Sequence, residues 1–371
     1  MSIPRARVRD LGITIGTLPT GVYNAITDVP GILVGHETIL LDEPRVARTG
    51  VTMIVPRDGD IWNDHACAGF FSFNGCGEMT GLPWIEESGL LHTPIGITNT
   101  NSVGVVRDAL SAYPIDMASK WGPDNAPSIS SSWLGALPVV AETWDGWLND
   151  ITAFHVTKEH AFKALADAKT GTVTEGNVGG GTGMICHEFK GGIGTSSRIV
   201  LYLDQEYTLG VLVQSNYGNR HLLRVDGVPV GRELDFSQVP DPWTTPPKGG
   251  SIIVIIATDA PLLPTQCTRL AKRATVGLSR VGGTGNNGSG DIFLAFSTGN
   301  HVPTNQAGLL TMQMIPNDHL SPFFDAVAEA TEEAILNALT AADTMVGWQG
   351  HSVQALPLDA LQRIMERYRP H

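Results

Sequence analysis

The chain has 371 residues, of which 42% are hydrophobic and 16% charged, so it is long and apolar enough to bury a large core, which excludes a disordered protein. Its 24 basic and 37 acidic residues give a net charge of −13, and no basic run offers a phosphate-binding stripe, which argues against a nucleic-acid partner. No stretch reaches about 18 uninterrupted apolar residues and no apolar core follows the basic N-terminus, so we expect a cytoplasmic protein that does not enter the membrane.

The first part of the chain predicts antiparallel strands followed by a helix. Residues 25–55 alternate short apolar runs with glycine and proline turns, which is typical of such strands. Residues 66–84 are small, glycine-rich and aromatic, which suits a loop or short helix lining a cavity, with close packing as the alternative. A helix is predicted over residues 102–112, with Ser102 as its N-cap and Pro114 as the residue that stops it.

The middle of the chain predicts strands that lead into polar residues. Residues 137–141 form an apolar run before Glu142, so this carboxylate is expected at or near a strand end, where it can face a site. Two further strands, 197–203 and 209–214, flank an acidic turn, and the second leads to Asn216. Residues 220–250 hold five prolines and show no helical period, which predicts a linker.

This linker meets a buried strand at Gly250 and Ser251. Residues 252–256 are an apolar, β-branched run, the pattern of a strand covered on both faces. A serine hydroxyl would therefore stand on a rigid strand beside an unshielded glycyl carbonyl. Attack on that carbonyl by an N-to-O acyl shift, followed by hydrolysis, would leave Ser251 as a new N-terminus with its own amine as base. From this stretch alone, an ordinary loop entering a core strand is the alternative.

The last third of the chain predicts helices around one further strand. Helical spacing is found over residues 265–279, from Ser321 through 345, and over 358–368, while residues 291–296 form an apolar run. Helices grouped before and after clusters of strands indicate stacked sheets between helix layers, rather than alternating βαβ units.

A hydroxyl and a carboxylate stand two residues apart where that strand begins. The segment before them, residues 280–290, is too rich in glycine for an ordinary connection. Because side chains alternate along a strand, Ser289 and Asp291 fall on one face, where both can stand beside the amine of Ser251. A bulged turn capped by Asp291 is the alternative.

Nucleotide and metal sites are weakly supported by the sequence. Residues 179–183 resemble the start of a tubulin-type phosphate loop, but Met184 breaks that pattern and no Walker or G-x-S-x-G motif occurs. The histidines lack ligand spacing such as H-E-x-x-H. The four cysteines lack C-x-x-C pairs, so we expect buried free thiols rather than zinc or a disulfide framework.

Four longer motifs occur together in this chain: G-G-S-I-I-V-I-I-A-T-D-A-P-L-L-P, N-G-S-G-D-I-F-L-A-F-S-T, E-G-N-V-G-G-G-T-G-M and A-E-T-W-D-G-x-L-N-D-I. With them the chain closely resembles the L-aminopeptidase D-amidase/D-esterase family, or β-peptidyl aminopeptidases, from Tyr23 to its C-terminal helices. The resemblance implies an α+β fold, a four-layer αββα sandwich like that of N-terminal-nucleophile hydrolases with different connectivity. It also implies cleavage into chains 1–250 and 251–371, which form one domain, and assembly of these heterodimers into a higher oligomer.

The same resemblance assigns roles to individual residues. Ser251 matches the nucleophile, and Ser289 with Asp291 matches the serine and acidic residue beside it. Asn216 matches the asparagine that donates to the oxyanion of the tetrahedral intermediate. Glu142 matches the carboxylate that holds the free amine of the substrate.

Two positions depart from the family pattern. Trp144 occupies a position where relatives carry tyrosine, so we expect it to form a pocket wall rather than to supply a hydroxyl. The loop before Ser289, T-G-N-N-G, is more polar than is usual in the family, which predicts a change in substrate preference.

These residues predict a self-cleaving serine aminopeptidase. It would remove an N-terminal L-α-, β- or D-residue from a short peptide, amide or ester through an acyl-enzyme on Ser251, without a metal or organic cofactor. The base would be the α-amine of Ser251, a group whose unperturbed pKa is roughly 7.7 to 8.0. The alternative is a non-catalytic binding or assembly protein that holds a small amine and keeps the bond between Gly250 and Ser251 intact.

Overall fold

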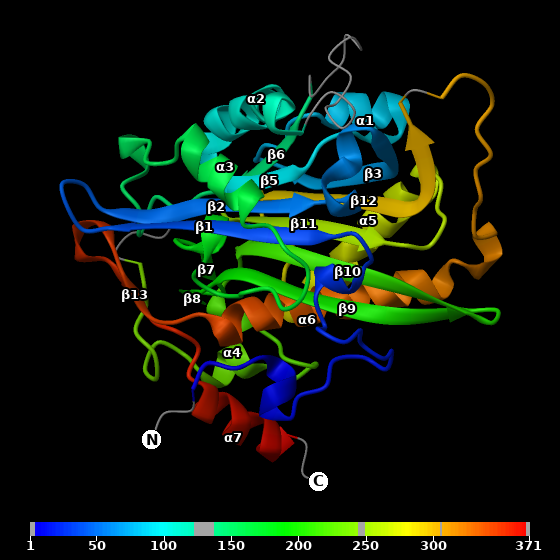
Figure 1. The fold of residues 1–371 in the computed structure, drawn as a ribbon. Coiled ribbons are helices and arrows are strands. Elements are labelled where there is room, and N and C mark those ends of the chain that lie inside the picture. Colours follow the sequence, from blue (N-terminus) through cyan, green and yellow to red (C-terminus); the bar gives the residue numbers. More distant parts are fainter. Residues whose placement is uncertain (1–3, 122–136, 244–248, 305, 369–371) are drawn as a thin grey trace.

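The computed structural model describes residues 4–121, 137–243, 249–304 and 306–368, with the backbone alone for 115–121. Its strands build two large sheets that lie face to face (Figure 1). The four-stranded sheet runs, in spatial order, through β1 (Leu33–Leu41), β2 (Ala47–Val55), β5 (Ile95–Asn99) and β6 (Val139–Thr143). The six-stranded sheet runs through β4 (Leu90–Leu91), β3 (Asp64–Gly75), β12 (Gly290–Pro303), β11 (Ser251–Thr258), β10 (Gln205–Asn216) and β9 (Gly192–Tyr202).

Helices cover the outer face of each sheet. The helices are α1 (Leu82–Ser88), α2 (Val103–Trp121), α3 (Lys158–Ala166), α4 (Val230–Glu233), α5 (Pro264–Val281), α6 (Ser321–Ala341) and α7 (Leu358–Tyr368). Helices α2 and α3 pack on the four-stranded sheet, with Val106 and Ala161 in their shared core. Helices α5 and α6 pack on the six-stranded sheet through residues such as Leu270 and Ile335. These layers confirm the predicted αββα sandwich. No helix of the described ranges is long and apolar enough to cross a membrane.

Strand β11 lies in the middle of the six-stranded sheet, between β10 and β12. Its Ile253 and Ile255 are buried in the core between the two sheets. Its Ile252 and Val254 are buried in the opposite core, under α5 and α6. Because both faces of β11 are covered by apolar layers, every residue of the run must be apolar, which confirms the prediction for this strand.

The prediction for residues 66–84 is wrong in its main part. Most of this segment is the long strand β3, which pairs with β12 and is followed by the short helix α1. Its glycines serve close packing rather than a loop, since a Cβ atom on Gly69 would lie 2.5 Å from the backbone nitrogen of Thr268 on α5. Close packing, the alternative interpretation, is therefore correct.

Helix α2 also differs from its prediction, because it continues through Pro114 to Trp121. A proline inside a helix removes one backbone hydrogen bond, and here that loss does not end the helix. Ser102 is not the cap. It belongs to a 3-10 turn, Thr100–Ser102, which is capped by the side chain of Asn99. The long C-terminal helix α6 ends at Ala341, before the predicted residue 345.

The predicted linker over residues 220–250 is largely packed structure. It contains helix α4, and its apolar side chains are buried against the core of the six-stranded sheet: Leu223, Val225, Val228, Val230, Leu234 and Val239. The sequence does not indicate this packing, because the prolines interrupt any helical period while the apolar side chains between them are still buried. Residues 244–248 lie outside the described ranges.

The triple glycine at residues 179–181 is a buried 3-10 turn between the layers, not a phosphate loop. A Cβ atom on Gly180 would lie 2.2 Å from Oε1 of Gln214 and 2.6 Å from the carbonyl oxygen of Ile97. Glycine is needed here for the close approach of neighbouring strands, so no space remains for a nucleotide. Two short hairpins complete the fold, β7 (Ile185–Cys186) with β8 (Phe189–Lys190) and β13 (Met345–Val346) with β14 (Ser352–Val353).

Candidate active site

Ser251 is the first residue of β11 and lies where three central strands meet at one edge. It pairs with Asn216, the last residue of β10, and with Gly290, the first residue of β12. Its side chain is buried, with 4% of its surface exposed. Neighbouring strands on both sides therefore hold the hydroxyl of Ser251 in place, as its position at the start of a core strand predicts.

The two glycines before Ser251 run through a passage that admits no side chain. A Cβ atom on Gly249 would lie 2.0 Å from the carbonyl oxygen of Gly288, and one on Gly250 would lie 2.9 Å from that of Asn216. The carbonyl oxygen of Gly250 accepts a hydrogen bond of 3.1 Å from the backbone nitrogen of Gly290. The carbonyl next to the nucleophile is thus already held by a backbone donor.

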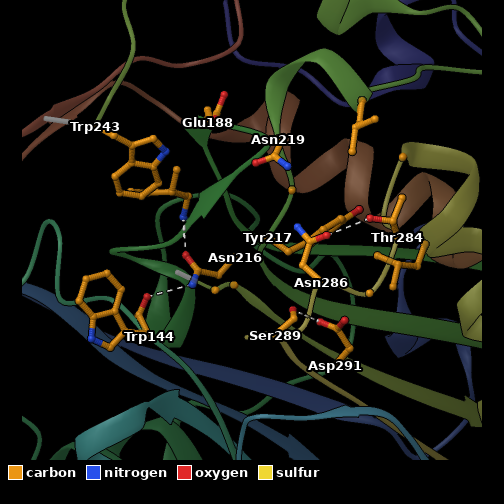
Figure 2. Close-up of a pocket in the computed structure, with 18 of the residues that line it drawn as sticks. Trp144, Glu188, Asn216, Tyr217, Asn219, Trp243, Thr284, Asn286, Ser289 and Asp291 are labelled. Atoms are coloured by element: carbon orange, nitrogen blue, oxygen red, sulfur yellow. Dashed lines mark hydrogen bonds between the residues drawn. The ribbon is translucent and has the colours of Figure 1, made fainter. Parts of the chain in front are cut away.

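Ser289 and Asp291 form a buried pair beside this strand edge (Figure 2). The hydroxyl of Ser289 donates to Oδ1 of Asp291 over 2.6 Å. The side-chain amide of Asn74 donates to the other carboxylate oxygen over 3.3 Å. Burial raises the pKa of Asp291, while the hydrogen bond from Ser289 opposes this rise. The predicted placement of both side chains on one face is confirmed.

The side-chain amide of Asn216 is held in one orientation by two backbone contacts. Its Oδ1 accepts a hydrogen bond of 2.8 Å from the nitrogen of Ile185, and its Nδ2 donates to the carbonyl oxygen of Trp144 over 3.0 Å (Figure 2). An amide nitrogen has two hydrogens. One hydrogen of Asn216 is engaged by Trp144, so the second is available to a ligand in the cavity that Asn216 lines.

Glu142 reaches the site from the other sheet, where it lies on β6. Its Oε1 accepts a hydrogen bond of 3.0 Å from the nitrogen of Glu78, and its Oε2 accepts one from the hydroxyl of Thr100. Burial raises the pKa of Glu142. Among the described residues no cationic side chain forms an ion pair with this carboxylate, so only these hydrogen bonds stabilise its charge.

Two cavities share Asn216 and Gly250 in their lining, and the larger one also includes Ser251. The larger, of about 380 Å³, is lined by Cys76, Thr100, Glu142, Trp144, Asn216, Gly249, Gly250, Ser251 and Gly288. The smaller, of about 140 Å³, is shown in Figure 2 and includes Ser289 and Asp291 in its lining. Trp144, which is 40% exposed, lines both cavities, as its predicted role as a pocket wall requires.

The structure thus brings together all of the residues that the sequence singles out, and adds others that it did not. Thr100 comes directly after β5, the strand that pairs with β6. The polar residues that follow this strand in the sequence are the signal that could have pointed to it. Asn74 lies near the end of β3, within the segment for which the sequence predicts a loop or short helix. Cys76 is exposed in the larger cavity, whereas the other three cysteines are buried free thiols. Within the described residues no group of three or more histidine, cysteine or acidic side chains is placed to hold a metal ion.

An αββα sandwich whose central strand begins with a serine, next to a buried carboxylate and an oriented amide, defines a serine hydrolase of the N-terminal-nucleophile type. The chain belongs to peptidase family S58, whose family model matches residues 24–353. This family membership makes the protein a serine aminopeptidase/amidase, as the relatives described next also indicate.

The chain is similar to characterised proteins over nearly its whole length. It is 47% identical to the β-peptidyl aminopeptidase BapA of Sphingosinicella microcystinivorans, over 98% of this chain and 92% of that protein. A solved β-aminopeptidase of a Burkholderia species is 49% identical, with a TM-score of 0.90, over 98% of this chain and all (100%) of that one. The L-aminopeptidase D-Ala-esterase/amidase of Ochrobactrum anthropi, described as a prototype for the serine aminopeptidases and a variant of the Ntn hydrolase fold, is 42% identical, with a TM-score of 0.89, over 98% of both chains. The sandwich architecture expected from the sequence is confirmed by these two structures.

Proposed function

We propose that the chain is a precursor that cuts its own bond between Gly250 and Ser251. The hydroxyl of Ser251 adds to the Gly250 carbonyl carbon, the C–N bond breaks, and the amide nitrogen leaves as the new α-amine, so an ester replaces the amide. Water then hydrolyses this ester to a Gly250 carboxylate and a free Ser251. The chains 1–250 and 251–371 remain parts of one domain, because β11 and β12 of the second chain lie between β3 and β10 of the first in the six-stranded sheet.

The contact between Gly250 and Gly290 supports this step. The backbone nitrogen of Gly290 already donates to the carbonyl oxygen of Gly250, so it can stabilise the oxyanion that forms there during cleavage. The oxyanion formed during self-cleavage would therefore have a hydrogen-bond donor, the backbone nitrogen of Gly290, other than the side chain of Asn216.

In the cut protein the α-amine of Ser251 takes the proton of its own hydroxyl, which attacks the carbonyl of a bound substrate. The free hydrogen of the Asn216 amide donates to the developing oxyanion. The leaving amine or alcohol receives the proton, and water releases the acyl group from Ser251. Ser289 and Asp291, at the start of the adjacent strand β12, lie where they can orient the α-amine.

Glu142 explains why a free amine is required on the substrate. A buried carboxylate without a cation is costly, and a protonated substrate amine in the larger cavity would be its partner. We propose short peptides, amides and esters with a free N-terminal residue as substrates. β-Residues are included because two of the relatives described above are named for β-peptides. Preference among L-α-, β- and D-residues, higher oligomers of the cut heterodimer and a cytoplasmic location stay predictions.

The observation that carries this proposal is the position of Ser251, buried at the first residue of a central strand and facing a cavity with Glu142 and Asn216. A denaturing gel of the purified protein tests it. The wild type should give two chains, and Ser251→Ala should give one. A wild type that stays whole and binds amines without hydrolysing any would instead support the non-catalytic binding protein, which the relatives do not favour.

A further inference from the structure

Behind the site, a lysine is buried without a countercharge. Lys190 is the last residue of β8 and has no exposed surface. Its Nζ lies 2.7 Å from the carbonyl oxygens of Met184 and Gly191 and 3.5 Å from that of Gly181. Among the described residues it forms no ion pair with a carboxylate.

Such a group is expensive to keep in the interior. Removing a cation from water is costly unless a charge or several dipoles replace its hydration. Burial lowers the pKa of Lys190 to about 7, which shows how strongly its surroundings oppose the charge. The three carbonyl contacts of Nζ offset part of this cost.

The peptide unit between Met184 and Ile185 links Lys190 to the site. Its carbonyl oxygen accepts from Nζ of Lys190 over 2.7 Å, and from the nitrogen of Gly191 over 2.9 Å. The nitrogen of the same peptide unit, on Ile185, donates to Oδ1 of Asn216 over 2.8 Å. One rigid, planar group thus contacts the lysine at one end and the oxyanion asparagine at the other.

Hydrogen bonds in such a series strengthen one another. An ammonium group on the carbonyl draws electrons from the peptide unit and makes its N–H a better donor. A stronger donor on Oδ1 of Asn216 in turn polarises the side-chain amide, so the hydrogens on its Nδ2 donate more strongly. These hydrogens are the ones assigned above to Trp144 and to the oxyanion.

We propose that Lys190 is a positioning residue for catalysis, which holds and polarises the Asn216 amide through the peptide unit between Met184 and Ile185. This inference rests on the proposed role of Asn216 as oxyanion donor. The hairpin of β7 and β8, although far from Ser251 in the sequence, would thus help to position the Asn216 amide.

A double-mutant cycle tests this inference. Lys190→Met keeps the length of the side chain and removes its donors. On protein shown by mass to be cut, kcat for β-alanyl p-nitroanilide should fall about tenfold, a part of the loss expected for an oxyanion donor, while KM stays nearly constant. In an Asn216→Ala background the same substitution should leave kcat almost unchanged, because the amide on which it acts is gone.

The outcomes separate this inference from the proposed function. Equal losses of kcat in both backgrounds would make Lys190 a structural residue and overturn the inference. An Asn216→Ala variant with normal kcat would instead overturn the role of Asn216 itself. If Lys190→Met does not fold, Lys190→Gln, which keeps an amide donor but removes the charge, replaces it. For Lys190→Gln we then expect a smaller loss of kcat at constant KM, and no loss in the Asn216→Ala background. An unchanged kcat of Lys190→Gln would contradict the inference.

Discussion

Two buried charged regions of this protein are built in opposite ways. Under α6, Arg198 lies 3.0 Å from Glu329 and 2.8 Å from Glu333, and Arg9 lies 2.7 Å from the other oxygen of Glu333. We call these four residues the α6 charge cluster. Glu142 at the active site and Lys190 behind it are also buried, yet neither forms an ion pair with a described side chain.

The difference teaches what each region does. Paired charges in the α6 charge cluster tie the N-terminal segment and β9 to α6, so they act on stability. Unpaired groups at the site cost stability and are explained by ligands or by the chemistry they support. Substitutions in the cluster should therefore change the free energy of unfolding, and substitutions at the site should change kinetics.

The largest effect is expected for Arg198→Met, which leaves Glu329 without its cation and Glu333 with Arg9 alone. The free energy of unfolding should fall by about 3 to 5 kcal/mol, the usual result of breaking a buried ion pair by removing one partner. Urea unfolding measures this loss, and kcat of the folded fraction should not change. Lys163→Met, which breaks an exposed pair with Glu37, is the control and should leave stability nearly unchanged. A loss of kcat without a loss of stability for Arg198→Met would contradict the division between the two regions.

The next effect is expected for Asn216→Ala at the site. Removal of one oxyanion donor should lower kcat by roughly a hundredfold or more, with little change in KM or in the melting temperature. The protein should still be cut, because Gly290 serves the carbonyl of Gly250. Asn286→Ala, which removes another amide from the lining of the smaller cavity, is the control and should keep kcat. Normal turnover by cut Asn216→Ala would make this amide a structural residue.

A smaller effect is expected for Glu142→Gln, which keeps the shape of the side chain but removes its charge. The value of kcat/KM for a free-amine substrate should fall roughly tenfold, or about 1.4 kcal/mol of transition-state binding. N-acetylated substrates should not be cleaved even by the wild type. Glu78→Gln removes an exposed neighbouring carboxylate that lines neither cavity, and should have no comparable effect. Equal hydrolysis of acetylated and free substrates would return Glu142 to a structural role.

The smallest effect concerns Asp145, a second buried acid that forms no ion pair with a described side chain and accepts a hydrogen bond from Asn149. Burial raises the pKa of Asp145 from 3.8 to about 7, so the folded protein holds a proton there that the unfolded chain releases. The stability this proton contributes is complete below pH 3.8 and is lost as the pH rises through about 7. Asp145→Asn should therefore melt a few degrees above the wild type at pH 8, with a difference that vanishes near pH 4. A difference independent of pH would contradict the raised pKa.

The sequence predicts the residues along a strand better than contacts between distant strands. The start of β11 at Ser251 and the shared face of Ser289 and Asp291 follow from apolar runs and the period of two. The apolar run before Glu142 predicts that this carboxylate can face a site, whereas the specific roles of Glu142 and Asn216 follow from the family motifs alone. Glu142 and Asn216 line one cavity because the four-stranded and six-stranded sheets stack on each other, and no local sequence pattern predicts how they stack.

The errors of prediction have a common physical origin. The glycines of β3 and the prolines before residue 244 are typical of loops and linkers, but here the glycines allow close helix packing and the prolines interrupt a packed segment. The link from Lys190 to Asn216 runs through backbone atoms, so residue types alone do not reveal it.

The central claim, that Ser251 becomes an N-terminal nucleophile, is tested most directly by intact-mass analysis during turnover of a slowly hydrolysed aminoacyl ester. We expect two chains, of which the smaller begins at Ser251 and transiently gains the mass of the acyl group, with the adduct mapped to its first residue. An uncut chain that hydrolyses the ester, or an acyl group carried by residues 1–250, would contradict the claim.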